Sequence, residues 1–303
     1  MLNELEYYST AGKLTNLAGY METIDELTDN PEFICQIVQG LMIHGGWIKV
    51  YNIEQKHRSL SNSLYMSDLL GEIINADQRS LTIPRLPENR VNGDCCRFST
   101  LSCAILRAKG IPARSRCGFS VYLGWKGSLE DHWIVEYWNG ERWVMNDPQI
   151  DPFQLSKLNT WGYNQLSIQA ELHVPNPHDL TDQDFITAGK AWQMCREGTI
   201  SPDICGIDDL HGLWFVRGQL LRDFAALNKI EIVPYLSGIE MSFDWSIWEL
   251  MSKSDDELSK NEFELLDTIA ALTLNVNKNL SAINEFYISN LSLQVPKAYT
   301  PRP

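Results

Sequence analysis

The chain is poor in positive charge: its 303 residues include 25 lysines and arginines against 39 aspartates and glutamates, a net charge of −14. Proteins that bind nucleic acids usually carry basic patches for the phosphates, so we expect no nucleic-acid partner. No apolar run approaches the length of a membrane span, and the acidic start Met1–Glu6 lacks the apolar region of a signal peptide. We therefore expect a cytoplasmic protein without a membrane partner.

Motifs for bound phosphates and metals are also missing. The sequence has no glycine-rich phosphate loop of the GxxxxGK or GxGxxG type, no HExxH and no C-x2-C pair. His173 and His178 have a zinc-like spacing, but they flank a proline-rich loop and no cysteine pair precedes them. Seven cysteines, an odd number in a chain of this length, do not suggest a disulfide framework. We expect free thiols, no metal site and no cofactor.

The sequence does contain one cysteine, one histidine and one aspartate in distinctive local contexts. Cys95 ends the segment Asn-Gly-Asp-Cys, His132 follows Glu-Asp, and Asp147 lies between an asparagine and a proline. These residue types are the minimum set for nucleophilic acyl chemistry. The thiolate attacks a carbonyl, the imidazole transfers the proton, and the carboxylate fixes the imidazole tautomer. The other histidines are assigned no role; they are His44, His57, His173, His178 and His211.

The local sequence predicts that Cys95 starts a helix. Asp94 or Asn92 can cap this helix, which is expected to run from about Cys95 to Lys109 and to end at Gly110. Its apolar residues recur on one stripe, which predicts a buried face. Unpaired backbone N–H groups and the helix dipole favour a thiolate in the first turn, whereas the neighbouring aspartate opposes it.

A β-hairpin is expected to bring the histidine and the aspartate together. The Asn-Gly pair at 139–140 follows an apolar and aromatic run and is the strongest two-residue hairpin signal. With a two-residue turn, Trp138 pairs with Glu141, and His132 lies directly opposite Asp147, within reach of a hydrogen bond. A four-residue loop would keep both residues on one face, opposed or one step diagonal, whereas a three-residue loop would separate them.

Further motifs surround these three residues: Gly93-Asp94-Cys95, Phe98, the run 106–114, Gly118-Phe119, His132-Trp133, and Trp143 before Asp147-Pro148. Together they resemble the core of the transglutaminase-like superfamily, in a bacterial-type member, over roughly residues 90–152. The resemblance implies an α+β, papain-related fold in which the catalytic-cysteine helix packs on an antiparallel sheet, with additional N- and C-terminal helices. It also implies that Cys95 is the nucleophile, His132 the general base and acid, and Asp147 its orienting partner.

Two features of this site stay open. Cys96 directly follows Cys95, and only one of two adjacent helical residues can point at a given site; alignment on Gly93 and Phe98 selects Cys95. In this superfamily a side chain upstream of the cysteine often stabilises the oxyanion, alongside the cysteine's own N–H. The candidates here are Gln78, Asn89 and Asn92, with Trp47 and Tyr65 as less expected alternatives.

The domain organisation is expected to be simple, with one domain spanning residues 1–303. The transglutaminase-like core occupies about 60–152, N-terminal helices precede it at 1–59, and a mainly helical region follows at about 174–294. A separate helical domain from about Val174 is the alternative.

The resemblance predicts a cysteine-dependent acyl-transfer enzyme that works through a thioester. Attack by water would give a protease or amidase, and attack by an amine a transglutaminase or another amide-forming acyltransferase. We expect hydrolysis of an amide or peptide bond in a peptide, protein or small amide, because water is abundant in an open cleft. A non-catalytic binding or scaffold protein is the alternative of another class. The aromatic residues expected to shape the pocket are Trp125, Trp133, Trp138, Trp161 and Trp192.

Overall fold

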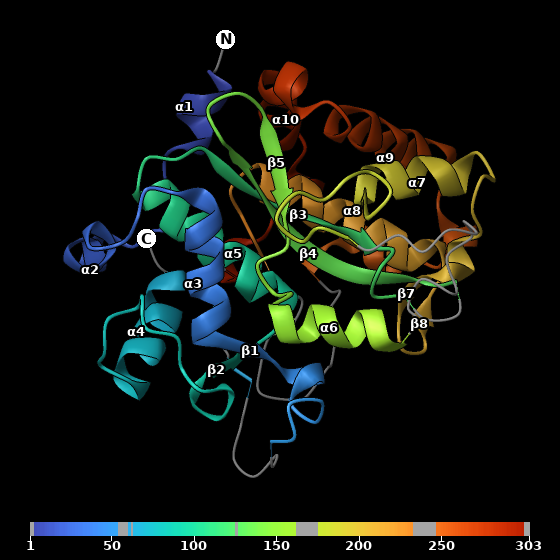
Figure 1. Cartoon of the computed structure of the whole chain (residues 1–303). Helices are drawn as coiled ribbons and strands as arrows, with labels where there is room; N and C mark the ends of the chain where they lie inside the picture. Colours follow the sequence, from blue (N-terminus) through green and yellow to red (C-terminus); the bar gives the residue numbers. More distant parts are fainter. Residues whose placement is uncertain are drawn as a thin grey trace.

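The computed structural model describes residues 3–53, 60–61, 63–124, 127–161, 175–232 and 247–299, and it has an α+β fold (Figure 1). The helices are α1 (Glu4–Tyr8), α2 (Met21–Asp25), α3 (Pro31–Leu41), α4 (Met66–Ala76), α5 (Cys95–Ala108), α6 (Pro152–Trp161), α7 (Ala188–Arg196), α8 (Leu213–Leu227), α9 (Lys260–Thr273) and α10 (Val276–Ser289). The strands are β1 (Met42–His44), β2 (Val91–Gly93), β3 (Ala113–Ser120), β4 (Leu129–Trp138), β5 (Trp143–Asn146), β6 (Phe185–Thr187), β7 (Cys205–Ile207) and β8 (Leu210–His211).

The larger sheet within these residues follows the order β6-β3-β4-β7-β8, and β5 also pairs with β4. Strands β3 and β4 pair antiparallel along their length, whereas β4 pairs with β7 in parallel. The sheet is therefore mainly antiparallel, as the family resemblance implied, with one parallel pairing at the β7 side. Strands β1 and β2 form a separate parallel pair, which the sequence did not indicate, with His44 opposite Gly93.

The hairpin between β4 and β5 closes with a longer turn than the Asn-Gly signal predicted. Trp138 pairs with Trp143, so the loop has four residues, 139–142, and the expected two-residue turn is wrong. The reason is that the Asn139 side chain accepts the backbone N–H groups of Glu141 and Arg142, both at 2.9 Å, and so makes an Asx turn. This register extends to place Asp147 one step diagonal to His132, the outcome expected for a four-residue loop.

Helix α5 is confirmed as the sequence predicted it. Asp94 is its N-cap, because its side chain accepts the N–H of Arg97 at 2.9 Å. Gly110 follows the helix with a φ of +73°, the left-handed conformation that a helix end requires and glycine adopts without strain. The predicted apolar stripe of the helix is buried: Phe98, Leu101, Ile105 and Leu106.

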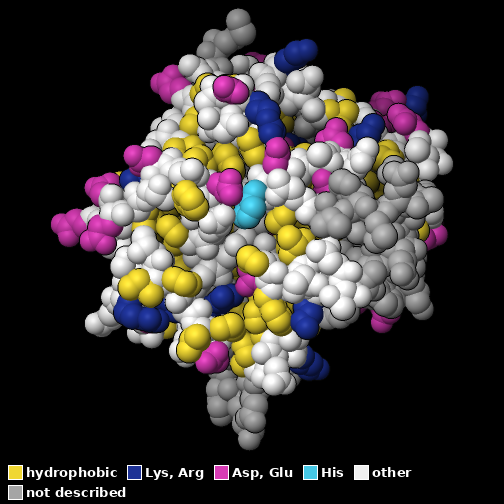
Figure 2. Space-filling model, viewed as in Figure 1, with side chains coloured by type: hydrophobic (Ala, Val, Ile, Leu, Met, Phe, Trp, Pro, Cys, Tyr) yellow, Lys and Arg dark blue, Asp and Glu magenta, His cyan; other side chains and the backbone are white. Residues whose placement is uncertain are grey.

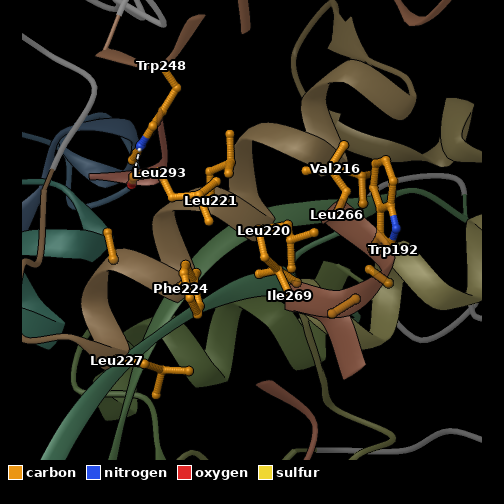
Figure 3. Packing of buried hydrophobic residues seen from close by; sticks show 14 of the residues in the cluster. Trp192, Val216, Leu220, Leu221, Phe224, Leu227, Trp248, Leu266, Ile269 and Leu293 are labelled. Carbon is orange, nitrogen blue, oxygen red and sulfur yellow. Dashed lines mark hydrogen bonds between the residues drawn. The ribbon is translucent and has the colours of Figure 1, made fainter. Parts of the chain in front are cut away.

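Two groups of helices pack on different parts of the sheet. Helices α3, α4 and α5 share a hydrophobic cluster with Val135, Tyr137 and Val144 of the hairpin. Helices α7 to α10 form a second cluster around α8 that includes Phe119 of β3 and Leu129 of β4. Figure 3 shows Val216 and Leu220 of α8 packed beside Trp192 of α7 and Leu266 and Ile269 of α9. The hairpin therefore contacts both sets of helices, through Leu129 and Trp143 on one side and through Val135, Tyr137 and Val144 on the other.

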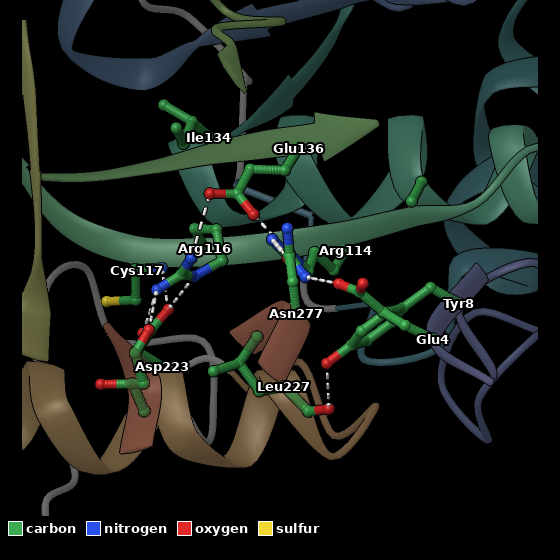
Figure 4. A network of polar contacts seen from close by, with 12 residues as sticks. Glu4, Tyr8, Arg114, Arg116, Cys117, Ile134, Glu136, Asp223, Leu227 and Asn277 are labelled. Carbon is green, nitrogen blue, oxygen red and sulfur yellow. Dashed lines mark hydrogen bonds and ion pairs between the residues drawn. The ribbon is translucent and has the colours of Figure 1, made fainter. Parts of the chain in front are cut away.

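A buried network of charges ties α1 and α8 to the sheet (Figure 4). Arg116 donates to both carboxylate oxygens of Asp223 in α8, each at 3.0 Å, and to Glu136 in β4 at 3.0 Å. Arg114 also donates to Glu136 and reaches Glu4 of α1 at 2.6 Å. Buried charges persist only when they are paired and hydrogen-bonded, so these contacts specify how α1 and α8 sit on the hairpin.

Candidate active site

The two adjacent cysteines occupy different environments at the start of α5. Cys95 is half-buried, whereas Cys96 is only 3% exposed and packs with Cys117, Trp133 and Ala226. The Cys96 sulfur also lies 3.7 Å from the hydroxyl of Thr100, one turn along the helix. Cys95 is therefore the more exposed residue of the two.

The surroundings of Cys95 favour the neutral thiol. Burial, followed by the nearby carboxylates of Asp131 and Asp94, raises the pKa of the Cys95 thiol well above its ordinary value, and the cation of Arg222 only partly opposes them. The helix start was expected to favour a thiolate and the neighbouring aspartate to oppose it. In the folded chain, burial and the nearby carboxylates, which favour the neutral thiol, outweigh the helix start, which favours the thiolate.

His132 lies in β4 and is buried, with 1% of its surface exposed. Its Nε2 atom is 2.7 Å from Oδ2 of Asp147. An ionised carboxylate can only accept, so Nε2 carries the proton in this contact and Nδ1 is the atom left for proton transfer. No hydrogen bond joins the Cys95 thiol to His132 among the residues that the structure describes, so proton transfer between the two stays a prediction.

Asp147 follows the last residue of β5 and is fully buried. Besides His132, its carboxylate accepts the hydroxyl of Tyr122 and, at 2.8 Å, the N–H of Gln149. Its own N–H donates to the carbonyl of Pro177 at 2.7 Å. Burial alone would raise the pKa of Asp147, but the charge of His132 and the hydrogen bonds from His132, Tyr122 and Gln149 lower it below the usual value.

The sequence did not point to Tyr122. This residue follows β3 and its hydroxyl reaches across to Asp147, 25 positions later in the chain. The rings of Tyr122 and His132 also meet edge to face, with centroids 6.2 Å apart. Tyr122 lies within the apolar stretch Val121–Leu123, and a tyrosine in such a stretch gives no sign of which carboxylate its hydroxyl will meet.

The candidates for oxyanion stabilisation are spread over different positions. Gln78 and Asn89 are exposed on the surface, whereas Trp47 and Tyr65 are each 8% exposed. Asn92 is half-buried in β2, opposite Ile43 of β1. His44, which was assigned no role from the sequence, is the residue of β1 opposite Gly93, and Gly93 lies two positions before Cys95. Strands β1 and β2 thus bring a distant segment beside the start of α5.

Residues 76–148 match the model of the Transglutaminase-like superfamily. They form a transglutaminase-like superfamily domain. The resemblance drawn from the motifs is therefore confirmed, and the matched segment contains the cysteine, the histidine and the aspartate.

A solved structure from Cytophaga hutchinsonii, described as "a Putative Cysteine Protease", is similar to the chain with 14% sequence identity and a TM-score of 0.33. The match covers 49% of this chain and 43% of that one, so it spans less than half of either protein. No curated protein matches the chain significantly.

The tryptophans expected to shape the pocket differ in position. Trp133, in the transglutaminase-like domain, and Trp192 are fully buried and belong to the hydrophobic clusters. Trp138 is half-buried and packs edge to face on Trp143 at 6.1 Å. Trp125 and the side chain of Trp161 lie outside the described residues.

Neither a metal site nor a membrane span is found in the described part of the chain. Within it, no group of three or more histidine, cysteine, aspartate or glutamate side chains is placed to hold a metal ion. No described helix is long and apolar enough to cross a bilayer. All seven cysteines are free thiols.

Proposed function

We propose that this protein is a cysteine-dependent acyl-transfer enzyme in which Cys95, His132 and Asp147 act together through a thioester intermediate. The observation that carries the proposal is the 2.7 Å contact between His132 Nε2 and Asp147 Oδ2, inside a transglutaminase-like domain whose half-buried cysteine starts a helix. A buried carboxylate that orients a buried imidazole is what a general base requires.

The first half of the reaction forms the thioester. His132 Nδ1 takes the proton of the Cys95 thiol as the sulfur attacks the carbonyl carbon, which gives a tetrahedral oxyanion and an imidazolium. Asp147, kept ionised by its lowered pKa, stabilises that imidazolium. The imidazolium then gives its proton to the leaving nitrogen, the C–N bond breaks, and an amine departs from the acylated sulfur.

The second half returns the free enzyme. A water molecule gives a proton to His132 as its oxygen attacks the thioester, and the C–S bond then breaks to release a carboxylic acid and the thiol. We assign hydrolysis of an amide or peptide bond, with a peptide, a protein or a small amide as substrate. Figure 2 shows hydrophobic side chains across the middle of one face of the molecule, with many charged side chains toward its edge.

The test is covalent labelling of the thiols, read by peptide mass spectrometry. With p-nitrophenyl acetate as an activated acyl donor, we expect an acetyl thioester at Cys95 and nitrophenol release that Cys95→Ala abolishes. The matched control is Cys96→Ala, which should keep both signals because that thiol is buried. Acylation of Cys96 in place of Cys95, or of no cysteine, would contradict the proposal and favour a binding protein on this fold.

A further inference from the structure

The position of His44 is explained neither by the family match nor by the local sequence. It ends β1 and precedes two glycines, and its partner in the parallel pairing is Gly93, two residues before Cys95. Residues 76–148 make up the matched domain, so His44 lies outside it in sequence and is placed opposite Gly93 by the pairing of β1 with β2. The pairing of β1 with β2 holds this histidine beside the start of α5.

The hydrogen bonding of the ring sets its tautomer. The backbone N–H of Gly46 donates to His44 Nδ1 at 3.2 Å. Nδ1 is therefore an acceptor, and in a neutral ring the proton must reside on Nε2. Glycine at position 46 leaves room for this contact, since a Cβ atom there would lie 3.3 Å from Nδ1. Nε2 makes no hydrogen bond to any residue that the structure describes, so its N–H is available to a ligand.

The ionisable groups that influence His44 belong to the candidate active site. Loss of hydration on burial is the main effect and lowers its pKa to about 4. Asp94, His132 and Asp147 are close enough to influence it electrostatically: the two carboxylates raise the pKa and the imidazole lowers it. At neutral pH the ring is thus an uncharged hydrogen-bond donor among the groups assigned to the reaction.

We propose that His44 donates its Nε2–H to the oxyanion that forms when Cys95 attacks the carbonyl carbon. The inference rests on the proposed function, because only acyl transfer creates that charge. Three facts support it: the place of His44 beside Gly93, the Nδ1 contact that fixes the tautomer, and the unpaired Nε2–H. The bond is a donation without proton transfer, and the unpaired N–H groups of the first turn of α5 supply the complementary donors.

Two substitutions separate this role from a structural one. His44→Asn keeps an acceptor near Nδ1 and a good residue for starting a helical turn, but it removes the donor at the Nε2 position. His44→Gln places an amide N–H near the Nε2 position and loses the Nδ1 contact to Gly46. A residue that only closes the turn would tolerate asparagine better, whereas an oxyanion donor would tolerate glutamine better.

Each variant is measured in two reactions of the Cys95 thiol at pH 8. Acetylation by p-nitrophenyl acetate passes through an oxyanion, whereas alkylation by iodoacetamide does not. We expect His44→Asn to slow acetylation about 10²–10³-fold, the usual effect of losing one such donor, with alkylation changed less than about 3-fold. His44→Gln should recover at least tenfold of that loss. His132→Ala, in contrast, should slow both reactions.

The opposite results overturn the proposal. Unchanged acetylation in His44→Asn, or an equal loss in both variants, would show that Nε2–H stabilises no oxyanion. A parallel fall in alkylation would mean that His44 acts on the thiol or on the fold. Failure of the wild-type protein to acetylate Cys95, with alkylation intact, would instead refute the proposed function itself. The midpoint of urea unfolding reports whether each variant is folded.

Discussion

Replacement of Asp147 by asparagine is the most demanding test of the proposed chemistry, because the surroundings of this side chain fix what the new amide can do. Oδ2 accepts from His132 and Tyr122, and Oδ1 accepts from the N–H of Gln149. If the amide keeps its oxygen toward Gln149, its NH2 group faces His132 and forces Nε2 to become an acceptor. The proton then resides on Nδ1, and the ring cannot take a proton from Cys95.

The other orientation of the amide is no better. Its oxygen then faces His132, but its NH2 group meets the N–H of Gln149, so two donors are left opposed in a fully buried place. Leaving a buried donor unpaired costs about 1–3 kcal/mol of stability. We therefore expect Asp147→Asn to lower the rate of Cys95 acetylation by ~10²–10⁴-fold and the free energy of unfolding by about 1–3 kcal/mol.

Stopped-flow acetylation and urea unfolding measure the two quantities. The control is Tyr122→Phe, which removes one donor to Asp147 but keeps the carboxylate, and it should slow acetylation by less than about tenfold. A wild-type rate in Asp147→Asn would refute the role given to the carboxylate. So would an equal loss in Tyr122→Phe, because the hydroxyl would then be the important group.

Asp147→Asn should also change how the free energy of unfolding depends on pH in acid. The folded-state pKa of Asp147 is lowered, so its ionised form stabilises the protein above the unfolded-state pKa of about 3.9. That contribution is lost as the pH falls through the lower, folded-state pKa. In Asp147→Asn the free energy of unfolding should therefore depend less on pH below about 4. A pH dependence identical to the wild type would show that Asp147 is not the group that titrates there.

The remaining predictions concern the charges around the site and the sheet. Asp131→Asn should speed alkylation of Cys95 several-fold at pH 7–8, because the Asp131 carboxylate raises the pKa of that thiol; a slower rate would contradict this. Arg116→Met should destabilise the fold by about 3–5 kcal/mol in urea unfolding, since it leaves the buried carboxylate of Asp223 without its ion pair. Arg142→Met, which removes an exposed ion pair, is its control and should cost less than about 1 kcal/mol.

Local signals in the sequence were sufficient for the cysteine helix. Its cap, its apolar stripe and the glycine after its end act within a few residues, so Asp94 and Gly110 could be recognised directly. The hairpin was harder, because the Asn-Gly pair fits both a two-residue turn and an Asx turn. The side-chain bonds of Asn139 select the longer loop, and no local pattern distinguishes the two.

Tyr122 and His44 could not be found from sequence because their roles depend on distant pairings. The hydroxyl of Tyr122 meets a carboxylate 25 positions away, and β1 lies about fifty positions before α5 in the chain. Both strands of the β1–β2 pair have only three residues, too short to show a periodic pattern. What reveals them is the packing of the whole chain, which brings several short segments to one end of α5.

The raised pKa of Cys95 decides how the proposed reaction must begin. A cysteine held as a thiolate is a ready nucleophile but is also the form that oxidants attack. Burial beside Asp131 and Asp94 keeps this thiol neutral, so the proton has to leave during the attack on the substrate. Because the proton leaves the thiol only during the attack, the imidazolium of His132 forms at that step. The carboxylate of Asp147 is needed then to stabilise the imidazolium. Oxidation by hydrogen peroxide should accordingly be slow at Cys95 in the wild type and faster in Asp131→Asn, in parallel with alkylation. Oxidation that is fast in the wild type and unaffected by Asp131→Asn would indicate a thiolate already present at rest.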